Sequence, residues 1–207
     1  MLVWKDVLQS QRGFKLADLW GWLLLLAVGA GVCLATEGIG GGLLLAVWAV
    51  MAGQRATSRL QKELASWSLL RSLPFDSGKL LLGEMILPWA LVVGMGWLSL
   101  LLFAGAWAPP MRLAAFVLLP VLSAAVSFAS AYDLLRQARA ELLLNASAPQ
   151  FSSLGGFLAV LCALLPLGVW TLLRSLPALG GVLAVGMGVV LAWAFWKQAG
   201  ERLRRIG

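Results

Sequence analysis

The sequence contains no histidine, two cysteines and one tyrosine, and only 12% of its 207 residues are charged. Without histidine, the chain has no Ser-His or Cys-His nucleophile pair, no His-ligated zinc or haem and no histidine proton switch. Cys33 and Cys162 each stand alone in an apolar stretch without a CxxC pattern, so we interpret both as small core residues. No glycine-rich run leads into Lys-Ser or Lys-Thr as a P-loop requires, so any ATP must be bound elsewhere.

Apolar residues, in contrast, are abundant. They make up 61% of the chain, whereas average globular chains contain about 45–50%. A soluble domain of this size could not bury so much apolar surface, because a large part of a small domain stays in contact with water. We therefore expect an all-α integral membrane protein.

Six stretches reach or approach the roughly 20 apolar residues that cross a bilayer as a helix. We predict spans at Leu19–Thr36, Gly38–Gly53, Leu80–Trp107, Met111–Leu135, Leu154–Leu173 and Ala178–Trp196. The chain then forms a single transmembrane domain over 1–207. Its parts are an amphipathic interfacial helix (1–18), spans one and two (19–53), a cytoplasmic elbow (55–79), spans three and four (80–135), a cytoplasmic loop (136–153), spans five and six (154–196) and a cytoplasmic tail (197–207).

The basic residues are distributed unevenly over these segments. With six spans, fourteen of the sixteen lysines and arginines lie on one side, and only Arg112 and Arg174 lie on the other. Cytoplasmic loops carry the excess of lysine and arginine, so both termini are predicted to be cytoplasmic. The net charge of +7 is therefore a topology signal that also favours anionic membrane lipids, and we expect no nucleic acid partner.

The segment 55–89 is longer and more polar than a simple connection needs. Leu60, Leu64 and Trp67 follow one another at helical spacing, which predicts an amphipathic helix. Pro74 should end this helix near Leu73, because a residue before proline avoids the helical region. We interpret the elbow as a docking element for a cytoplasmic partner, with a helix lying on the lipid surface as the alternative.

The order of Glu63, LLRSLP (69–74), a polar turn and KLLLGE (79–84) resembles the loop between spans two and three of type-2 ABC exporter permeases. The resemblance implies a bacterial inner-membrane subunit that is not itself an enzyme and binds no cofactor. It also implies that a separate ABC ATPase subunit binds ATP-Mg, and that the permease forms a homodimer or a heterodimer with a second permease. The residues implied to couple with the ATPase are Glu63, Trp67, Leu70, Arg71, Leu73 and Pro74.

Two features differ from that family. The connection at 174–177 is too short for the re-entrant helices that members usually carry between spans five and six. Glu84 stands where members often carry a lysine.

Two acidic residues fall within the predicted spans, where ionisable groups are costly and suggest function. Glu84 lies about one turn into span three and Asp133 near the cytoplasmic end of span four, so we expect both to be wet. Pairing of Asp133 with Arg136 at i, i+3 is the alternative role. Neither acid lies near the midplane, where a proton relay would be expected.

Two ridges of small residues have the i, i+4, i+8 spacing that lets helices approach closely. They serve either packing within the chain or the seam of a dimer. The residues are Ser123, Ser127 and Ala131 in span four, and Gly180, Ala184 and Gly188 in span six.

These observations predict the permease subunit of an ABC exporter, which moves an amphipathic or hydrophobic substrate with ATP hydrolysed by its partner. One alternative is a six-span substrate-binding subunit of a vitamin-type importer. A non-catalytic membrane scaffold also remains open. A membrane enzyme has the least support, because no acids, histidines or metal ligands converge.

Overall fold

The structure is a computed structural model that describes residues 16–35, 39–64, 77–105, 107–144, 152–173 and 176–206. Within these ranges all regular elements are α-helices, which confirms the all-α prediction for this part of the chain. The helices are α2 (Leu16–Leu34), α3 (Ile39–Leu64), α5 (Ser77–Phe103), α6 (Pro109–Leu144), α7 (Ser153–Leu172) and α8 (Pro177–Ile206). The predicted interfacial helix lies outside the described residues, except for 16–18, which begin α2.

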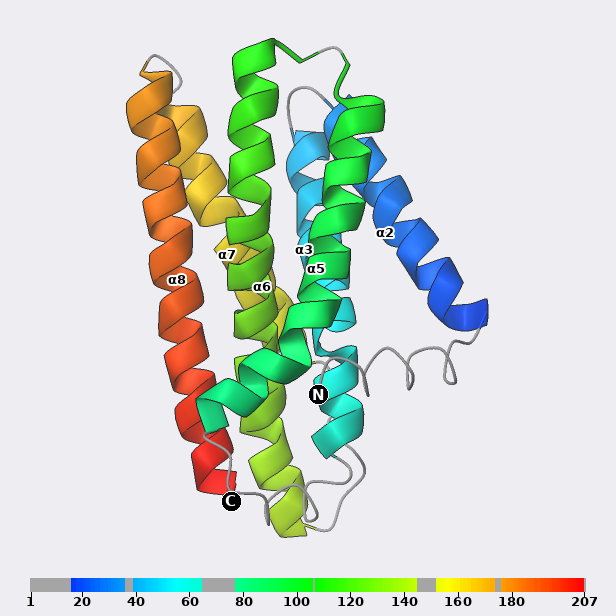
Figure 1. Ribbon diagram of the computed structural model, residues 1–207, viewed down its shortest axis with the longest axis vertical. Coiled ribbons are helices and arrows are strands. Elements are labelled where there is room, and N and C mark those ends of the chain that lie inside the picture. The colour runs from blue at the N-terminus through cyan, green and yellow to red at the C-terminus, as the bar shows by residue number, and fades with distance from the viewer. Residues whose placement is uncertain are drawn as a thin grey trace.

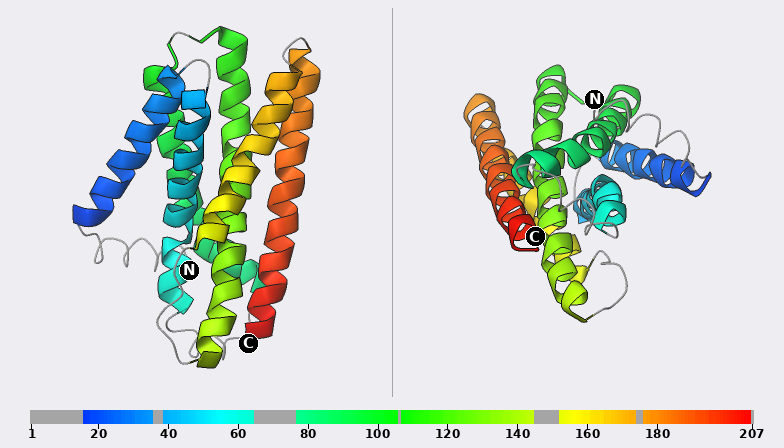
Figure 2. Two further views of the ribbon diagram at one scale, coloured as in Figure 1. Left: turned by 180° about the vertical axis from the view of Figure 1, so that it is seen from behind. Right: turned by 60° about the horizontal axis from the view of Figure 1, so that its bottom comes forward.

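Successive helices run up and down along a common long axis (Figures 1 and 2). The central helix is α6, which packs against α3, α5, α7 and α8. At one edge of the bundle, α2 packs on α3 and α5. The start of α2 and the end of α8 lie at the same end of the bundle (Figure 1).

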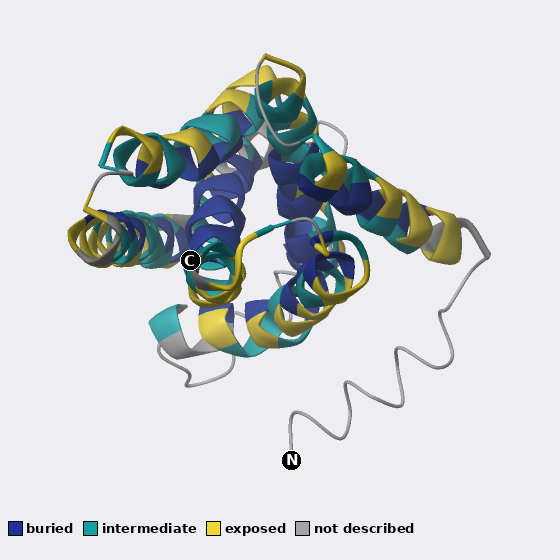
Figure 3. Cartoon of the chain, turned by 90° about the horizontal axis from the view of Figure 1, so that it is seen from above, coloured by how far each residue is buried: buried dark blue, intermediate teal, exposed yellow. Residues whose placement is uncertain are grey.

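Many of the buried side chains in this bundle are small, and many of the exposed ones are large and apolar. Ala49, Ala52 and Ala125 are fully buried, whereas Ile39 is 85% exposed and Leu101 73% exposed. Figure 3 shows buried positions turned toward the middle of the bundle and exposed positions on its outside. Close helix approach through small residues with large apolar side chains directed outward is typical of helices packed in lipid.

In the described part of the chain, five helices are long and apolar enough to cross a membrane, namely α3, α5, α6, α7 and α8. The structure thus supports a multi-pass membrane protein. The apolar stretch of α2, Leu19–Leu34, is shorter, so its place as a sixth span stays a prediction.

Three helices continue past the ends of the predicted spans. The helix α3 runs through Gly53 to Leu64, α6 reaches Leu144, and α8 reaches Ile206. The predicted cytoplasmic loop and tail are therefore helical over much of their length. Helix continuation has a local reason, because residues 54–64 contain no proline or glycine and are rich in good helix formers.

Prolines inside helices change the shape of the bundle. The helix α5 bends part-way along its length, so that its first part crosses α6 obliquely toward the end of α8 (Figure 1). Pro88 lies inside α5 and accounts for the bend, because proline removes one backbone hydrogen bond and clashes with the preceding turn. This oblique part of α5 forms one wall of the groove described below.

Candidate functional site: the basic end and a lateral groove

The predicted coupling segment is described only at its two stems, the end of α3 and the start of α5. Glu63 lies in the last turn of α3. The other five residues assigned to coupling lie outside the described residues: Trp67, Leu70, Arg71, Leu73 and Pro74.

Both stems are anchored in one buried cluster at the end of the bundle where most basic residues are predicted to lie. We call this cluster the basic-end core. It contains Leu60 and Leu64 from the end of α3, and Leu81 and Met85 from the start of α5, all at most 3% exposed. Its complete set of buried residues is Ala56, Leu60, Leu64, Leu81, Met85, Ala131, Leu134, Leu135, Ala138, Ala199 and Leu203, so it joins α3, α5, α6 and α8. Any force applied to the elbow would therefore reach the two long helices α6 and α8.

This arrangement corrects the prediction for the apolar stripe of the elbow. We expected Leu60 and Leu64 to face a partner or lipid, but they are buried against the chain's own helices. The reason is that α3 is unbroken. Ala49, Ala52 and Ala56 continue into Leu60 and Leu64 at steps of three or four residues, so all five lie on its inward face.

An ion pair also ties the two stems together. Arg59 Nε of α3 lies 2.8 Å from Glu84 Oε2 of α5, and the two side chains are only 18% and 17% exposed. The Glu84 side chain is therefore less exposed to solvent than expected. Its charge is compensated by a neighbouring helix, as buried charges generally require.

Asp133 is fully buried, which corrects the expectation that it is wet. Its carboxylate accepts hydrogen bonds from Ser152 Oγ at 2.6 Å, Gln137 Nε2 at 2.7 Å and Arg136 at 3.3 Å. The Arg136 contact is the i, i+3 pair that the sequence offered as the alternative. Ser152 is also the N-cap of α7 and accepts from Gly155 N at 3.2 Å. Asp133 thus joins α6 to the beginning of α7.

The two small-residue ridges lie inside the single chain. Ser123, Ser127 and Ala131 of α6 are at most 1% exposed, and Ala184 of α8 is fully buried. A Cβ atom added at Gly188 would lie 2.6 Å from Val121 Cγ1 of α6, and one at Gly180 would lie 3.0 Å from Leu173 Cβ. These positions therefore allow α8 to approach α6 and the end of α7 closely.

Tryptophan indoles form hydrogen bonds between segments that the sequence did not reveal. Trp89, Trp97 and Trp107 donate to the backbone carbonyls of Pro120 (3.3 Å), Phe116 (3.0 Å) and Cys33 (2.9 Å), respectively. The sequence offered a signal for the Trp97 bond alone, because Pro120 leaves the carbonyl of Phe116, one turn earlier, without its usual donor.

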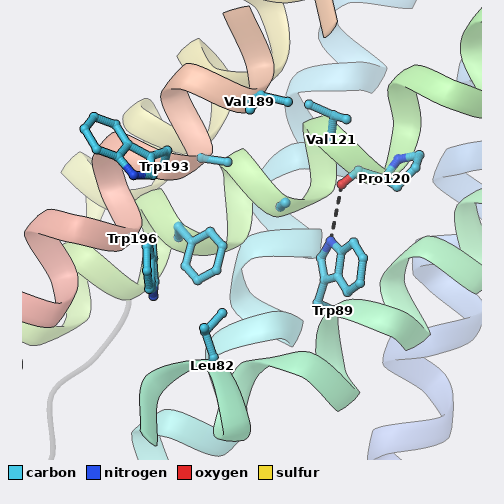
Figure 4. A pocket seen from close by; sticks show the side chains of 10 residues that line it. Leu82, Trp89, Pro120, Val121, Val189, Trp193 and Trp196 are labelled. Carbon is cyan, nitrogen blue, oxygen red and sulfur yellow. Dashed lines mark hydrogen bonds between the residues drawn. The ribbon is translucent and has the colours of Figure 1, made fainter. Parts of the chain in front are cut away.

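A lateral groove of about 500 Å³ lies between α5, α6 and α8 (Figure 4). Its lining side chains are apolar or aromatic, and four of them come from α8 at helical spacing. The lining residues are Leu82, Trp89, Pro120, Val121, Ala124, Phe128, Val189, Ala192, Trp193 and Trp196. The volume lies in the range of about 300–1,000 Å³ that is typical of small-molecule sites.

Basic side chains continue along α8 from the groove toward the end of the helix. Lys197 Nζ lies 5.5 Å from the centre of the Trp193 ring, and the Arg202 guanidinium lies 4.6 Å from the centre of the Tyr132 ring. Arg202 also donates to Tyr132 Oη at 2.9 Å. The groove therefore adjoins a part of α8 that carries basic side chains, with the acidic Glu201 one turn beyond Lys197.

Among the described residues, no group of three or more acidic or cysteine side chains could hold a metal ion. Comparison of the chain with protein-family models, curated proteins and solved structures finds no match.

Proposed function

We propose that this chain is the permease subunit of an ABC exporter and moves an amphipathic or hydrophobic substrate with energy from a separate ATPase. The observation that carries the proposal is the common anchoring of both elbow stems in the basic-end core. An element that receives motion from an ATPase must be firmly connected to the membrane helices. Leu60 near the end of α3 and Leu81 near the start of α5 provide that connection.

The ion pair between Arg59 and Glu84 supports the same proposal. Its 2.8 Å contact holds the end of α3 to the start of α5, so that the two stems would move as one unit. The chemistry of the spans favours an apolar or amphipathic cargo, because the central parts of the predicted spans carry no charged residue.

The test needs a candidate P-loop ATPase, which is sought first among the reading frames beside this chain's gene. The two proteins are co-expressed, purified together and placed in nanodiscs, and ATP hydrolysis is measured for the wild type and for Leu73→Asp. Assembly and coupled hydrolysis should both be lost in the variant. The matched control is Leu176→Asp, which puts the same change at an exposed leucine between α7 and α8.

Two results would contradict the proposal. One is a wild-type chain that forms no complex with that ATPase, and the other is a Leu73→Asp variant with unchanged assembly and hydrolysis. A membrane scaffold would bind the ATPase without affecting its ATP hydrolysis, so the hydrolysis measurement also distinguishes an exporter permease from a scaffold.

The substrate-binding subunit of a vitamin-type importer has less support. Such a subunit would have to dock through its small-residue faces, but Ser123, Ala131 and Ala184 are fully buried in the chain itself. Mass spectrometry of the purified chain tests this alternative, because such a subunit should retain a tightly bound small molecule.

A further inference from the structure

The walls of the lateral groove identify the kind of molecule that can enter it. The groove is formed by the membrane-spanning parts of α5, α6 and α8, and its surface is almost wholly apolar. A polar molecule would lose its hydration there without finding hydrogen-bond partners. The chemistry of the groove therefore fits a hydrocarbon chain supplied by the surrounding bilayer.

A helix from a second copy fits the groove poorly. Helices pack together in membranes through small residues that allow their backbones to approach. The groove instead presents large side chains, among them Trp89, Trp193 and Trp196 (Figure 4). A flexible acyl chain can follow such an uneven surface, whereas a helix cannot.

The charge beside the groove indicates which lipid supplies that chain. Lys197 directly follows Trp196, is exposed, and lies with its ammonium 5.5 Å from the Trp193 ring that lines the groove. An acyl chain in the groove would place its headgroup on this side of the bundle, near Lys197. Basic side chains beside pockets between membrane helices are a known arrangement for anionic lipid headgroups.

We propose that the groove between α5, α6 and α8 is a binding site for an anionic phospholipid, with one acyl chain against Trp89, Phe128 and Trp196 and the phosphate beside Lys197. This site does not depend on the proposed transport function. Pro120 and Val121 of α6 line the groove, and residues on one face of α8 line it from the side.

Native mass spectrometry of the full chain tests the proposal. The protein is released from nanodiscs that contain phosphatidylglycerol and phosphatidylcholine in equal amounts, both with the same two acyl chains. The wild type should retain one phosphatidylglycerol in preference to phosphatidylcholine. Ala124→Phe, which fills the groove, should abolish this retained lipid, whereas Val190→Phe, on an exposed part of α8 outside the lining, should leave it unchanged.

Lys197→Gln tests the charge without altering the packing of the bundle. It should reduce the preference for phosphatidylglycerol by about fivefold, the effect expected for one lysine near an anionic surface. Arg204→Gln, a change at another exposed basic residue of α8, should have a much smaller effect. Equal retention of both lipids by the wild type would overturn the proposal. So would a Lys197→Gln variant with undiminished preference, or a dimer that Ala124→Phe dissociates.

Discussion

The indole of Trp97 replaces a hydrogen bond that proline removes from α6. Pro120 has no backbone N–H, so the carbonyl of Phe116, one turn earlier, lacks its usual donor. Trp97 Nε1 donates to this carbonyl at 3.0 Å, and its ring stacks on Phe116 with 4.6 Å between the ring centres. An unsatisfied carbonyl is expensive in lipid, so this bond makes the proline tolerable inside a spanning helix.

We therefore predict that Trp97→Phe lowers the free energy of unfolding by about 1–3 kcal/mol, the cost of leaving a polar group without a partner in an apolar surrounding. The measurement is the thermal unfolding midpoint in detergent. The matched control, Trp20→Phe, changes a tryptophan that is 66% exposed and should have a small effect. In a Pro120→Ala background the backbone N–H returns, so Trp97→Phe should cost clearly less there. Equal costs in both backgrounds would show that the indole has another role.

A second prediction concerns the hydrogen bonds of the Asp133 side chain. Its Oδ2 accepts from two donors, Ser152 Oγ and Gln137 Nε2, while its Oδ1 faces Arg136. Asp133→Asn removes the negative charge, so the hydrogen bonds from Ser152 and Gln137 lose their charge assistance. Such bonds contribute about 1.5–3 kcal/mol each.

Asp133→Asn should accordingly lower the unfolding midpoint substantially. Arg136→Gln should lower it less, because the Arg136 side chain is 43% exposed and its bond competes with solvent. A larger loss from Arg136→Gln than from Asp133→Asn would contradict this account of the cluster.

Among whole helices, α8 shows how spacing in the sequence becomes a contact between helices. The spacing of Gly180, Ala184 and Gly188 was visible in the sequence, but whether it faced another part of the chain or a second copy was not. Whether the small-residue face packs within the chain or against a second copy depends on how α8 is rotated relative to its neighbouring helices in the folded chain. The same limit explains the stripe on α3, since the periodicity of Leu60 and Leu64 identified an apolar face but not the helices that cover it.

The seam between α6 and α8 leads to a prediction with two glycines of one helix. A Cβ at Gly188 would lie 2.6 Å from Val121 Cγ1, and β-branched valine has little freedom to turn away. Gly188→Ala should therefore destabilise the chain by about 1–3 kcal/mol, as overpacking generally does. A Cβ at Gly186 meets no atom within 4 Å, so Gly186→Ala should be neutral or stabilising. Unfolding midpoints of the two variants are measured in the same detergent. A larger loss for Gly186→Ala than for Gly188→Ala would contradict the close contact between α6 and α8 at this position.

For the molecule as a whole, composition alone was sufficient to predict a membrane protein, because only lipid can accommodate this much apolar surface, and the length of the apolar stretches then predicted helices. The groove was not predictable, since it arises from the bend at Pro88 and from residues of three helices that are distant in sequence. The polar cluster around Asp133 was only half visible. Arg136 lies one turn away, but Ser152 reaches Asp133 only through the fold.

The distribution of charge over the two ends of the bundle leads to a prediction about orientation. Arg204 lies in the last turn of α8, whereas Arg112 lies in the first turn of α6, at the opposite end, and both are exposed. If the basic end is cytoplasmic, a membrane-impermeant maleimide added to intact cells should label Arg112→Cys and not Arg204→Cys. Lysis should make Arg204→Cys reactive. The native Cys33 and Cys162 are 4% and 2% exposed, so they should contribute little background. Labelling of Arg204→Cys in intact cells would reverse the predicted orientation and would also place the elbow outside the cell, where a cytoplasmic ATPase could not reach it.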